Sequence, residues 1–369
     1  MEYKYHCQQQ AELFASSIIP MPENYPLRDG LPECFRTHFA KLCELAKNIY
    51  NDMAKQPEAY GLMLVDIESK DRNLIRDGYR TIHRFADTLS NLSRCGELQN
   101  HQLVISTEKF REVMKKRHGA VSCPVPKYEL ILSRLVDFGF VISDFDGKPF
   151  AKTVESFSVE YPDYPDMTDT IKTYCDCWEI IKSNRSSVKV WVNEFHHHFY
   201  RFDYKITADM DKIPVQQWIS DESKYNGLSD EVANFYVAFY EYSLKYKGIS
   251  FNGDYNYKSK RIARSIQWEY GSSPLSLIIK DINKYISEIE KMPDGVKEPF
   301  TRNSCNHCKY QGATEEHCKF RRNWTLDNIP HDACAFYGFQ FNDFDLAFVP
   351  DYWRLLELDY GLEKKHKNI

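Results

Sequence analysis

Four cysteines near the end of the chain have a spacing that suits a metal ion. They are Cys305, Cys308, Cys318 and Cys334, separated by two, nine and fifteen residues. A Cys-x-x-Cys turn supplies two corners of a tetrahedron, and two later thiolates complete a zinc shell with bonds of about 2.3 Å. A closed shell of four thiolates leaves no position open for water or substrate. The spacing therefore predicts a structural zinc site that holds this segment together.

Other chemistries for the same cysteines remain open. Four thiolates also hold an iron–sulfur cluster, although the ferredoxin-type spacing is absent. Cys305 and Cys308 could form a redox pair, but no thioredoxin-like strand–helix–strand context surrounds them. The cysteines could also simply be buried. Three nearby histidines could replace one sulfur as a ligand: His307, His317 and His331.

A run of three histidines, His196 to His198, is a second candidate for metal binding. Alternate side chains of a strand share a face, so the outer two histidines would point the same way if this segment were a strand. No third ligand follows at a fixed spacing. The aromatic residues around the run favour a packed sheet surface over a metal site.

The composition is typical of a soluble, cytoplasmic protein. The 369 residues include 11 cysteines, an odd number scattered over the whole length, as is usual in a reducing compartment. No run approaches the ~18 apolar residues of a membrane-spanning helix, and the first residues lack the apolar centre of a signal peptide. A net charge of −5 argues against binding of nucleic acid over the whole surface but leaves room for one basic patch.

The elements that would position these residues begin with helices. In residues 31–57 the apolar side chains recur every three or four positions, which places them on one face of a helix, and residues 72–93 repeat the pattern. We assign residues 1–98 to a helical N-terminal region. Nothing in this region indicates chemistry.

A different order of elements follows. Residues 105–117 predict a helix capped at Ser106 or Thr107, and residues 124–139 predict a second helix that ends at Gly139. Two β-prone runs come next, joined by the sequence DFDGKPF. An Asp-Gly pair between such runs is a strong signal for a hairpin. Helix, turn, helix and hairpin therefore follow one another directly.

The sequence ILSRLVDFGFVISDFDGKPF, residues 131–150, resembles the recognition helix and wing of the winged helix-turn-helix superfamily. The resemblance covers about residues 100–165. It implies that the second helix lies in a major groove and that the wing contacts the DNA backbone. The residues predicted to contact DNA are Lys115, Arg117, Lys127, Tyr128, Arg134 and Lys148. Many winged helices bind proteins instead, and Glu129 and Asp137 on the presumed recognition helix make a weak DNA-binding pattern.

The remainder of the chain alternates between helical and β-prone segments. The expected elements are a helix over 163–184, one or two strands over 188–206, a helix over 228–246 that is capped near Ser229, a helix over 274–292, and a last helix over about 350–360. We assign 99–165 to a winged helix, 166–187 to a linker helix, 188–300 to an α+β domain, and 301–369 to a cysteine-rich metal-binding segment with a C-terminal helix.

The sequence thus predicts an α+β protein with a helical N-terminal region, a winged helix-turn-helix, and a C-terminal α+β domain that carries a four-cysteine zinc staple. Its predicted function is that of a regulator or adaptor, for example in transcription regulation, that binds double-stranded DNA or a protein partner. One alternative is an enzyme with its site in residues 188–300, which is disfavoured because the chain has no Gly-rich phosphate loop, nucleophile elbow or HExxH motif. The other alternative is an interaction scaffold that does not bind DNA.

Overall fold

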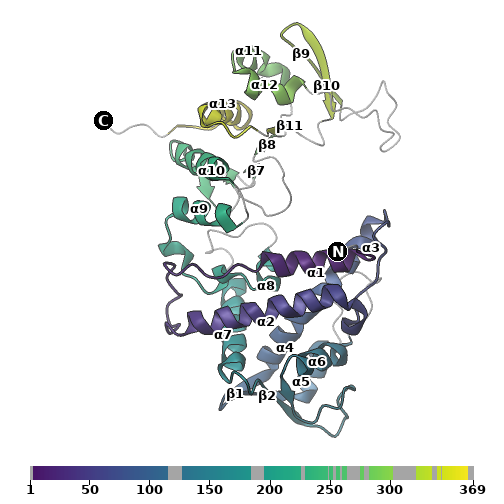
Figure 1. Cartoon of the computed structure of the whole chain (residues 1–369). Helices are drawn as coiled ribbons and strands as arrows, with labels where there is room; N and C mark the ends of the chain where they lie inside the picture. The colour runs from purple at the N-terminus through teal and green to yellow at the C-terminus, as the bar shows by residue number, and fades with distance from the viewer. Residues whose placement is uncertain are drawn as a thin grey trace. The chain divides into compact units, whose positions relative to one another are not determined.

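A computed structural model shows how the elements are arranged (Figure 1). It describes residues 3–114, 127–183, 195–225, 229–247, 249–251, 255–257, 260–263, 275–277, 282–301, 321–334, 339–341 and 343–364. The chain forms two compact units, the first made of Met1–Val188 with Glu194–Lys212 and the second of Lys189–Asn193 with Ile213–Ile369. Both units combine helices with strands, as the α+β class requires. The N-terminal region, the winged helix and nearly all of the linker helix, assigned separately from the sequence, lie in the first unit.

The first unit is built around α2 (Phe35–Lys55), the helix predicted over 31–57. Its apolar stripe is buried over the whole length, from Phe35 to Met53. α1 (His6–Ser17) lies alongside α2 (Figure 1). Each fully buried Leu, Ile or Phe side chain contributes roughly 1.5–3 kcal/mol of transfer free energy, so this stripe accounts for the position of α2 in the core.

The helix predicted over 72–93 is present in two pieces. These are α3 (Arg72–Ile82) and α4 (Arg84–Cys95), which meet at His83. The Asp71 carboxylate caps α3, because it accepts hydrogen bonds from the backbone N–H groups of Asn73 at 2.9 Å and Leu74 at 3.2 Å. The His83 ring stacks on Tyr200 with 3.9 Å between centroids. The junction of the two helices is therefore packed against Tyr200, a residue that is distant in the sequence.

An antiparallel sheet follows, with the strand order β1-β2-β4-β3. Its strands are β1 (Gly96–Gln99), β2 (Gln102–Ser106), β3 (Val141–Ile142) and β4 (Ser156–Glu160). Ile105 of β2 lies opposite Phe157 of β4, and both side chains are buried. Alternate residues of β2 and β4 are therefore buried on one face, and the helices α4, α5 and α7 contact the sheet.

Three helices flank this sheet in the sequence. α5 (Thr107–Met114) and α6 (Tyr128–Asp137) lie between β2 and β3, and α7 (Asp166–Ser183) follows β4. The predictions of these helices are confirmed. Gly139, just past α6, has φ +98°, a conformation that glycine adopts without strain, so the predicted stop of α6 is also confirmed.

The connection between β3 and β4 is longer than the expected hairpin connection DFDGKPF. The two strands do pair in antiparallel fashion, but residues 143–155 form a long connection between them, and the Asp-Gly pair lies inside it. Phe145 and Phe150 of the connection pack together with 5.6 Å between ring centroids, and Phe150 is buried. Burial of these aromatic rings favours the longer path over a two-residue turn.

The strands expected over 188–206 are a wrong prediction for the part that the structure describes. Residues 195–206 contain α8 (Phe195–Tyr200) and a 3₁₀ helix, η3 (Tyr204–Ile206). Phe199 stacks on Trp178 of α7 at 5.3 Å between centroids. The aromatic residues that looked like one face of a strand are instead buried against α7 in a helical turn.

The second unit contains four longer helices in its described ranges. They are α9 (Val215–Tyr225), α10 (Asp230–Ser243), α12 (Asp294–Thr301) and α13 (Val349–Tyr360). α10 begins at the predicted cap, since the Ser229 hydroxyl accepts a hydrogen bond from the Val232 N–H at 3.3 Å. The Trp353 ring is fully buried, and its Nε1–H donates to the Phe239 carbonyl at 3.0 Å, which docks α13 on α10.

Short strands complete the second unit. β5 (Ile249–Phe251), β6 (Tyr255–Tyr257) and β7 (Lys260–Ala263) form one antiparallel sheet, β8 (Leu275–Leu277) pairs with β11 (Phe339–Phe341), and β9 (Arg321–Leu326) pairs with β10 (Ile329–Cys334). The long helix expected over 274–292 is a wrong prediction, because residues 275–277 form β8 and, among the described residues of this range, the helical ones are those of the 3₁₀ helix η5 (Ile282–Lys284) and of α11 (Ile286–Ile289). Within the described ranges, no helix has both the length and the apolar character needed to cross a bilayer.

Candidate interaction site

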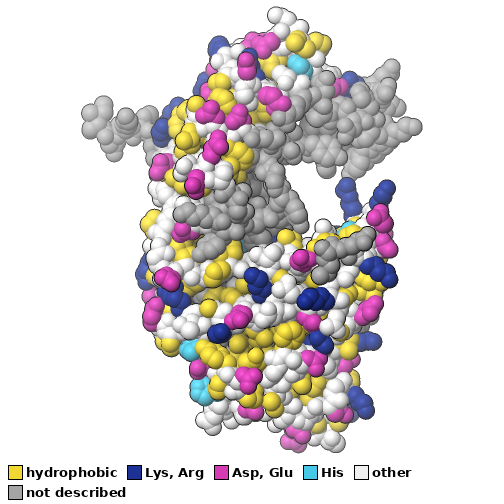
Figure 2. Space-filling view, in the orientation of Figure 1, with side chains coloured by type: hydrophobic (Ala, Val, Ile, Leu, Met, Phe, Trp, Pro, Cys, Tyr) yellow, Lys and Arg dark blue, Asp and Glu magenta, His cyan; other side chains and the backbone are white. Residues whose placement is uncertain are grey.

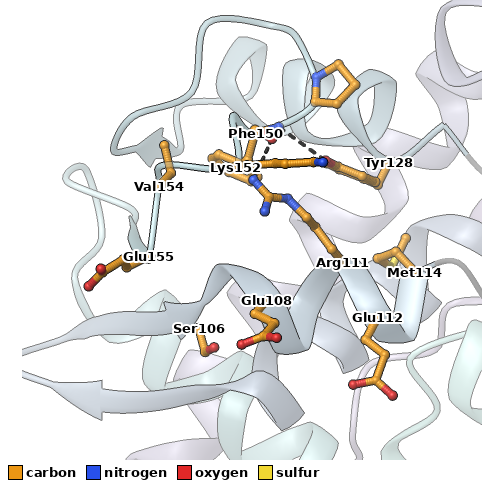
Figure 3. Close-up of a pocket in the computed structure, with 11 residues that line it drawn as sticks. Ser106, Glu108, Arg111, Glu112, Met114, Tyr128, Phe150, Lys152, Val154 and Glu155 are labelled. Atoms are coloured by element: carbon orange, nitrogen blue, oxygen red, sulfur yellow. Dashed lines mark hydrogen bonds between the residues drawn. The ribbon is translucent and has the colours of Figure 1, made fainter.

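A surface hollow of about 1170 Å³ lies between α5, the start of α6 and the β3–β4 connection (Figure 3). Its apolar lining includes Met114, Tyr128, Phe150 and Val154. These residues come from three different segments, so the hollow exists only when α5, α6 and the connection pack together. We call it the α5 hollow.

Aromatic packing forms the base of the α5 hollow. The Phe150 ring stacks on Phe157 of β4 with 4.2 Å between centroids, and Tyr128 lies parallel to it at 6.3 Å. Phe110 of α5 meets Tyr128 edge to face at 5.4 Å. Such offset and edge-to-face pairs add roughly 0.5–1.5 kcal/mol beyond burial of their area. The base of the hollow is therefore part of the core of this region.

Hydrogen bonds fix the connection above this base. Arg111 Nη2 donates to the Phe150 carbonyl at 2.5 Å and also to the Ala151 carbonyl, and the Phe150 N–H donates to Tyr128 Oη at 3.2 Å (Figure 3). A guanidinium that satisfies two backbone carbonyls holds a loop without any regular strand. Arg111 is thus a positioning residue of the connection.

The rim of the α5 hollow carries three carboxylates. Glu108 and Glu112 lie on α5, and Glu155 lies at the end of the connection (Figure 3). All three are exposed, and within the described residues none of them has a hydrogen bond or ion pair through its side chain. Lys152, also exposed, is the rim's one cation in this part of the chain apart from Arg111. Among the described lining residues, the three carboxylates therefore outnumber the two cations.

Arg134, predicted to contact DNA, is engaged inside the first unit. Its Nη2 lies 2.7 Å from Asp52 Oδ2 and its Nη1 lies 2.8 Å from Asp137 Oδ2. The guanidinium also lies over the Tyr60 ring at 5.6 Å from the centroid. Its side chain is 20% exposed. A base contact by Arg134 would require these pairs to break.

Three other residues predicted to contact DNA lie in the described part of the first unit. Lys127 and Lys148 are exposed, and Tyr128 lines the α5 hollow. Lys115 and Arg117 lie outside the described residues. On the face shown in Figure 2, Lys and Arg side chains are interspersed with Asp and Glu.

Three of the four predicted zinc ligands, Cys305, Cys308 and Cys318, lie outside the described residues. Cys334 is the last residue of β10, where it pairs with Arg321 of β9. Among the described residues, no group of histidine, cysteine, aspartate and glutamate side chains is arranged to hold a metal ion. The predicted site itself is thus not covered by that observation.

His198, the last residue of the histidine run, belongs to a buried ion-pair network that the sequence pattern did not indicate. His198 Nδ1 lies 2.6 Å from Asp203 Oδ2, and Lys205 Nζ lies 3.4 Å from the same oxygen. Burial lowers the pKa of His198. Burial raises the pKa of Asp203, but the charge of Lys205 and the hydrogen bond with His198 outweigh it and lower that pKa overall. Asp203 follows His198 by five residues and precedes Lys205 by two. This spacing would indicate an ion-pair network only if the segment were known not to be a strand.

Comparison with protein-family models, with curated proteins and with solved structures found no match for this chain.

Proposed function

We propose that the protein is an adaptor or regulator that binds another protein through residues 84–160, a module of the winged helix-turn-helix type. The support is the order of elements: α4, β1, β2, α5, α6, β3, a long connection and β4, with the sheet order β1-β2-β4-β3. In a winged helix, the two central helices precede a hairpin whose connection is the wing. Residues 143–155 would be that wing.

The ion pairs of Arg134 are the observation that favours a protein partner over DNA. α6 would be the recognition helix, and its one cation is bonded to Asp52 and Asp137. Residues 84–160 contain eleven Lys and Arg and ten Asp and Glu. Affinity for duplex DNA comes largely from cations that neutralise phosphates, so a module with so small a cationic surplus is better suited to a protein partner.

A pair of measurements tests this proposal. We expect the full-length protein to show no saturable binding of a fluorescent random-sequence DNA duplex at low salt. A photoreactive amino acid at Val141, 48% exposed on the edge strand β3, should form one discrete adduct with a cellular protein, which is then purified and tested for direct binding. The same label at Ile180 of α7, outside the module and 56% exposed, is the matched control.

Two outcomes would contradict the proposal. The first is DNA binding that falls steeply with salt and weakens in Lys127→Gln and Lys148→Gln but not in Lys47→Gln, an exposed lysine of α2. The second is equal labelling of partners from Val141 and Ile180, which would mean that the module has no specific partner.

We also propose that Cys305, Cys308, Cys318 and Cys334 hold a structural zinc ion. The register of the β9–β10 hairpin supports this, because Cys334 lies opposite Arg321, and Cys318 precedes Arg321 by three residues in the sequence. Cys318 is therefore close in sequence to the strand that carries the partner of Cys334, and four thiolates are a donor set that zinc accepts.

Metal analysis of the purified chain tests the zinc proposal. We expect about one zinc per chain and a colourless preparation, because zinc has a filled d shell and four thiolates form one closed site. Cys334→Ser should lower the zinc content well below this value, whereas Cys34→Ser, at an exposed free cysteine of the first unit, should leave it unchanged. A brown preparation that contains iron would replace zinc by an iron–sulfur cluster. A metal-free chain would refute both.

A further inference from the structure

We infer that the α5 hollow binds a short segment of the partner protein in which a basic side chain lies next to an apolar one. The inference rests on the proposed function, since it names the chemistry that the module would recognise. Three features of the hollow carry it: the size of the space, the apolar lining and the charges on the rim.

The interior of the hollow suits an apolar side chain. Met114 and Phe150 are each 6% exposed, and the half-buried Tyr128 and Val154 complete the lining. Sites for small ligands commonly measure about 300–1,000 Å³, so a hollow of about 1170 Å³ has room for several side chains. An aromatic or aliphatic anchor that enters it would bury its surface against these residues.

The rim suits a cation. Glu108 and Glu112 are four residues apart on α5 and therefore lie on one face of the helix (Figure 3). Like charges at this spacing destabilise a helix by a few tenths of a kcal/mol. A basic side chain between them would remove this repulsion and gain a partner for each carboxylate. Arginine is the best match, since its planar guanidinium bonds carboxylates in pairs.

Other ligands fit the rim less well. Among the described residues that line the hollow, the two cations are Arg111, already bonded to the Phe150 and Ala151 carbonyls, and Lys152. A phosphate-rich ligand would therefore meet three carboxylates and one available ammonium group. Nucleic acid is disfavoured by the same charges. A basic segment of a protein is the occupant that both the rim and the interior favour.

Binding of synthetic peptides to the full-length protein tests the inference. The probe is a fluorescein-labelled peptide in which arginine and phenylalanine alternate, followed by fluorescence anisotropy at moderate salt. We expect saturable binding that weakens when alanine replaces phenylalanine and disappears when glutamate replaces arginine. The first comparison reports the apolar interior, and the second reports the rim.

Substitutions on the rim place the peptide in the hollow. Glu108→Gln, Glu112→Gln and Glu155→Gln should each weaken binding by about two- to fivefold, the effect of losing one exposed ion pair. Lys152→Gln should strengthen binding, because it removes a like charge. Glu97→Gln on β1 removes the same charge from an exposed site of the module outside the hollow and should change nothing. Thermal unfolding checks that each variant folds.

Each outcome decides for or against the hollow. Equal weakening by Glu97→Gln and the rim substitutions would mean that the peptide responds to overall charge, and the inference would be wrong. A partner that crosslinks to the photoreactive residue at position 141 but binds all rim variants equally well would also overturn the inference. The proposed function would then still stand. DNA binding in the earlier titration would instead overturn the proposed function itself.

Discussion

Asp203→Asn is expected to lower the free energy of unfolding of the first unit by about 3–5 kcal/mol. The Asp203 carboxylate is buried, lies 2.6 Å from His198 Nδ1 and accepts a hydrogen bond from the Lys205 backbone N–H at 2.9 Å. Removing one partner of a buried pair leaves the buried Lys205 ammonium without this carboxylate, and that desolvated charge is the source of the large cost.

Urea unfolding monitored by tryptophan fluorescence measures this loss. The matched control is Asp209→Asn in the same segment, because Asp209 pairs with Lys212 at 2.8 Å and the Lys212 side chain is 56% exposed. An exposed pair contributes about 0–1 kcal/mol, so the control should lose little. Equal losses in the two variants would mean that the His198–Asp203–Lys205 network does not stabilise the fold.

The same network should make stability depend on pH. The pKa values of Asp203 and His198 are both lowered in the folded protein, Asp203 because Lys205 and His198 outweigh its burial and His198 because of burial. The unfolded chain therefore binds more protons than the folded chain as the pH falls. The stabilisation is complete above about pH 6.5, decreases first through His198, and decreases again through Asp203 below about pH 4. Asp203→Asn should flatten the acid part of this curve.

Phe150→Ala is expected to destabilise the first unit by about 3–5 kcal/mol and to loosen the β3–β4 connection. The ring is 6% exposed and stacks on Phe157 at 4.2 Å. Its removal leaves a cavity between the connection and β4. The hydrogen bonds of the Phe150 backbone to Arg111 and Tyr128 would then lack the packing that holds them in place.

Hydrogen exchange combined with urea unfolding measures the effect of Phe150→Ala. Faster exchange should be confined to residues 141–160, because the ring contacts this segment. Phe145→Ala is the control, since Phe145 lies in the same connection but is only half-buried. A larger loss of unfolding free energy in Phe145→Ala than in Phe150→Ala would show that the connection is held by the Phe145 ring rather than by the Phe150 ring.

Local sequence patterns predicted those elements whose position depends on their own residues. α2, α6, α10 and α13 lie where the apolar period, the Ser229 cap and the Gly139 stop placed them. A one-sided apolar stripe has the same consequence in any fold, because it must be buried against something. The helix–helix–strand order and the mixed helix and strand class follow from such local signals.

Tertiary structure alone decided the features that depend on distant partners. Arg134 looked like a residue available for DNA, but Asp52, from α2, lies 2.7 Å from it. The aromatic run before residue 206 had the composition of a strand, yet contact with α7 makes it helical. Neither partner has a fixed spacing in the sequence. Periodicity reports which face of an element is buried, whereas the identity of the residue across the contact is set only when the elements pack.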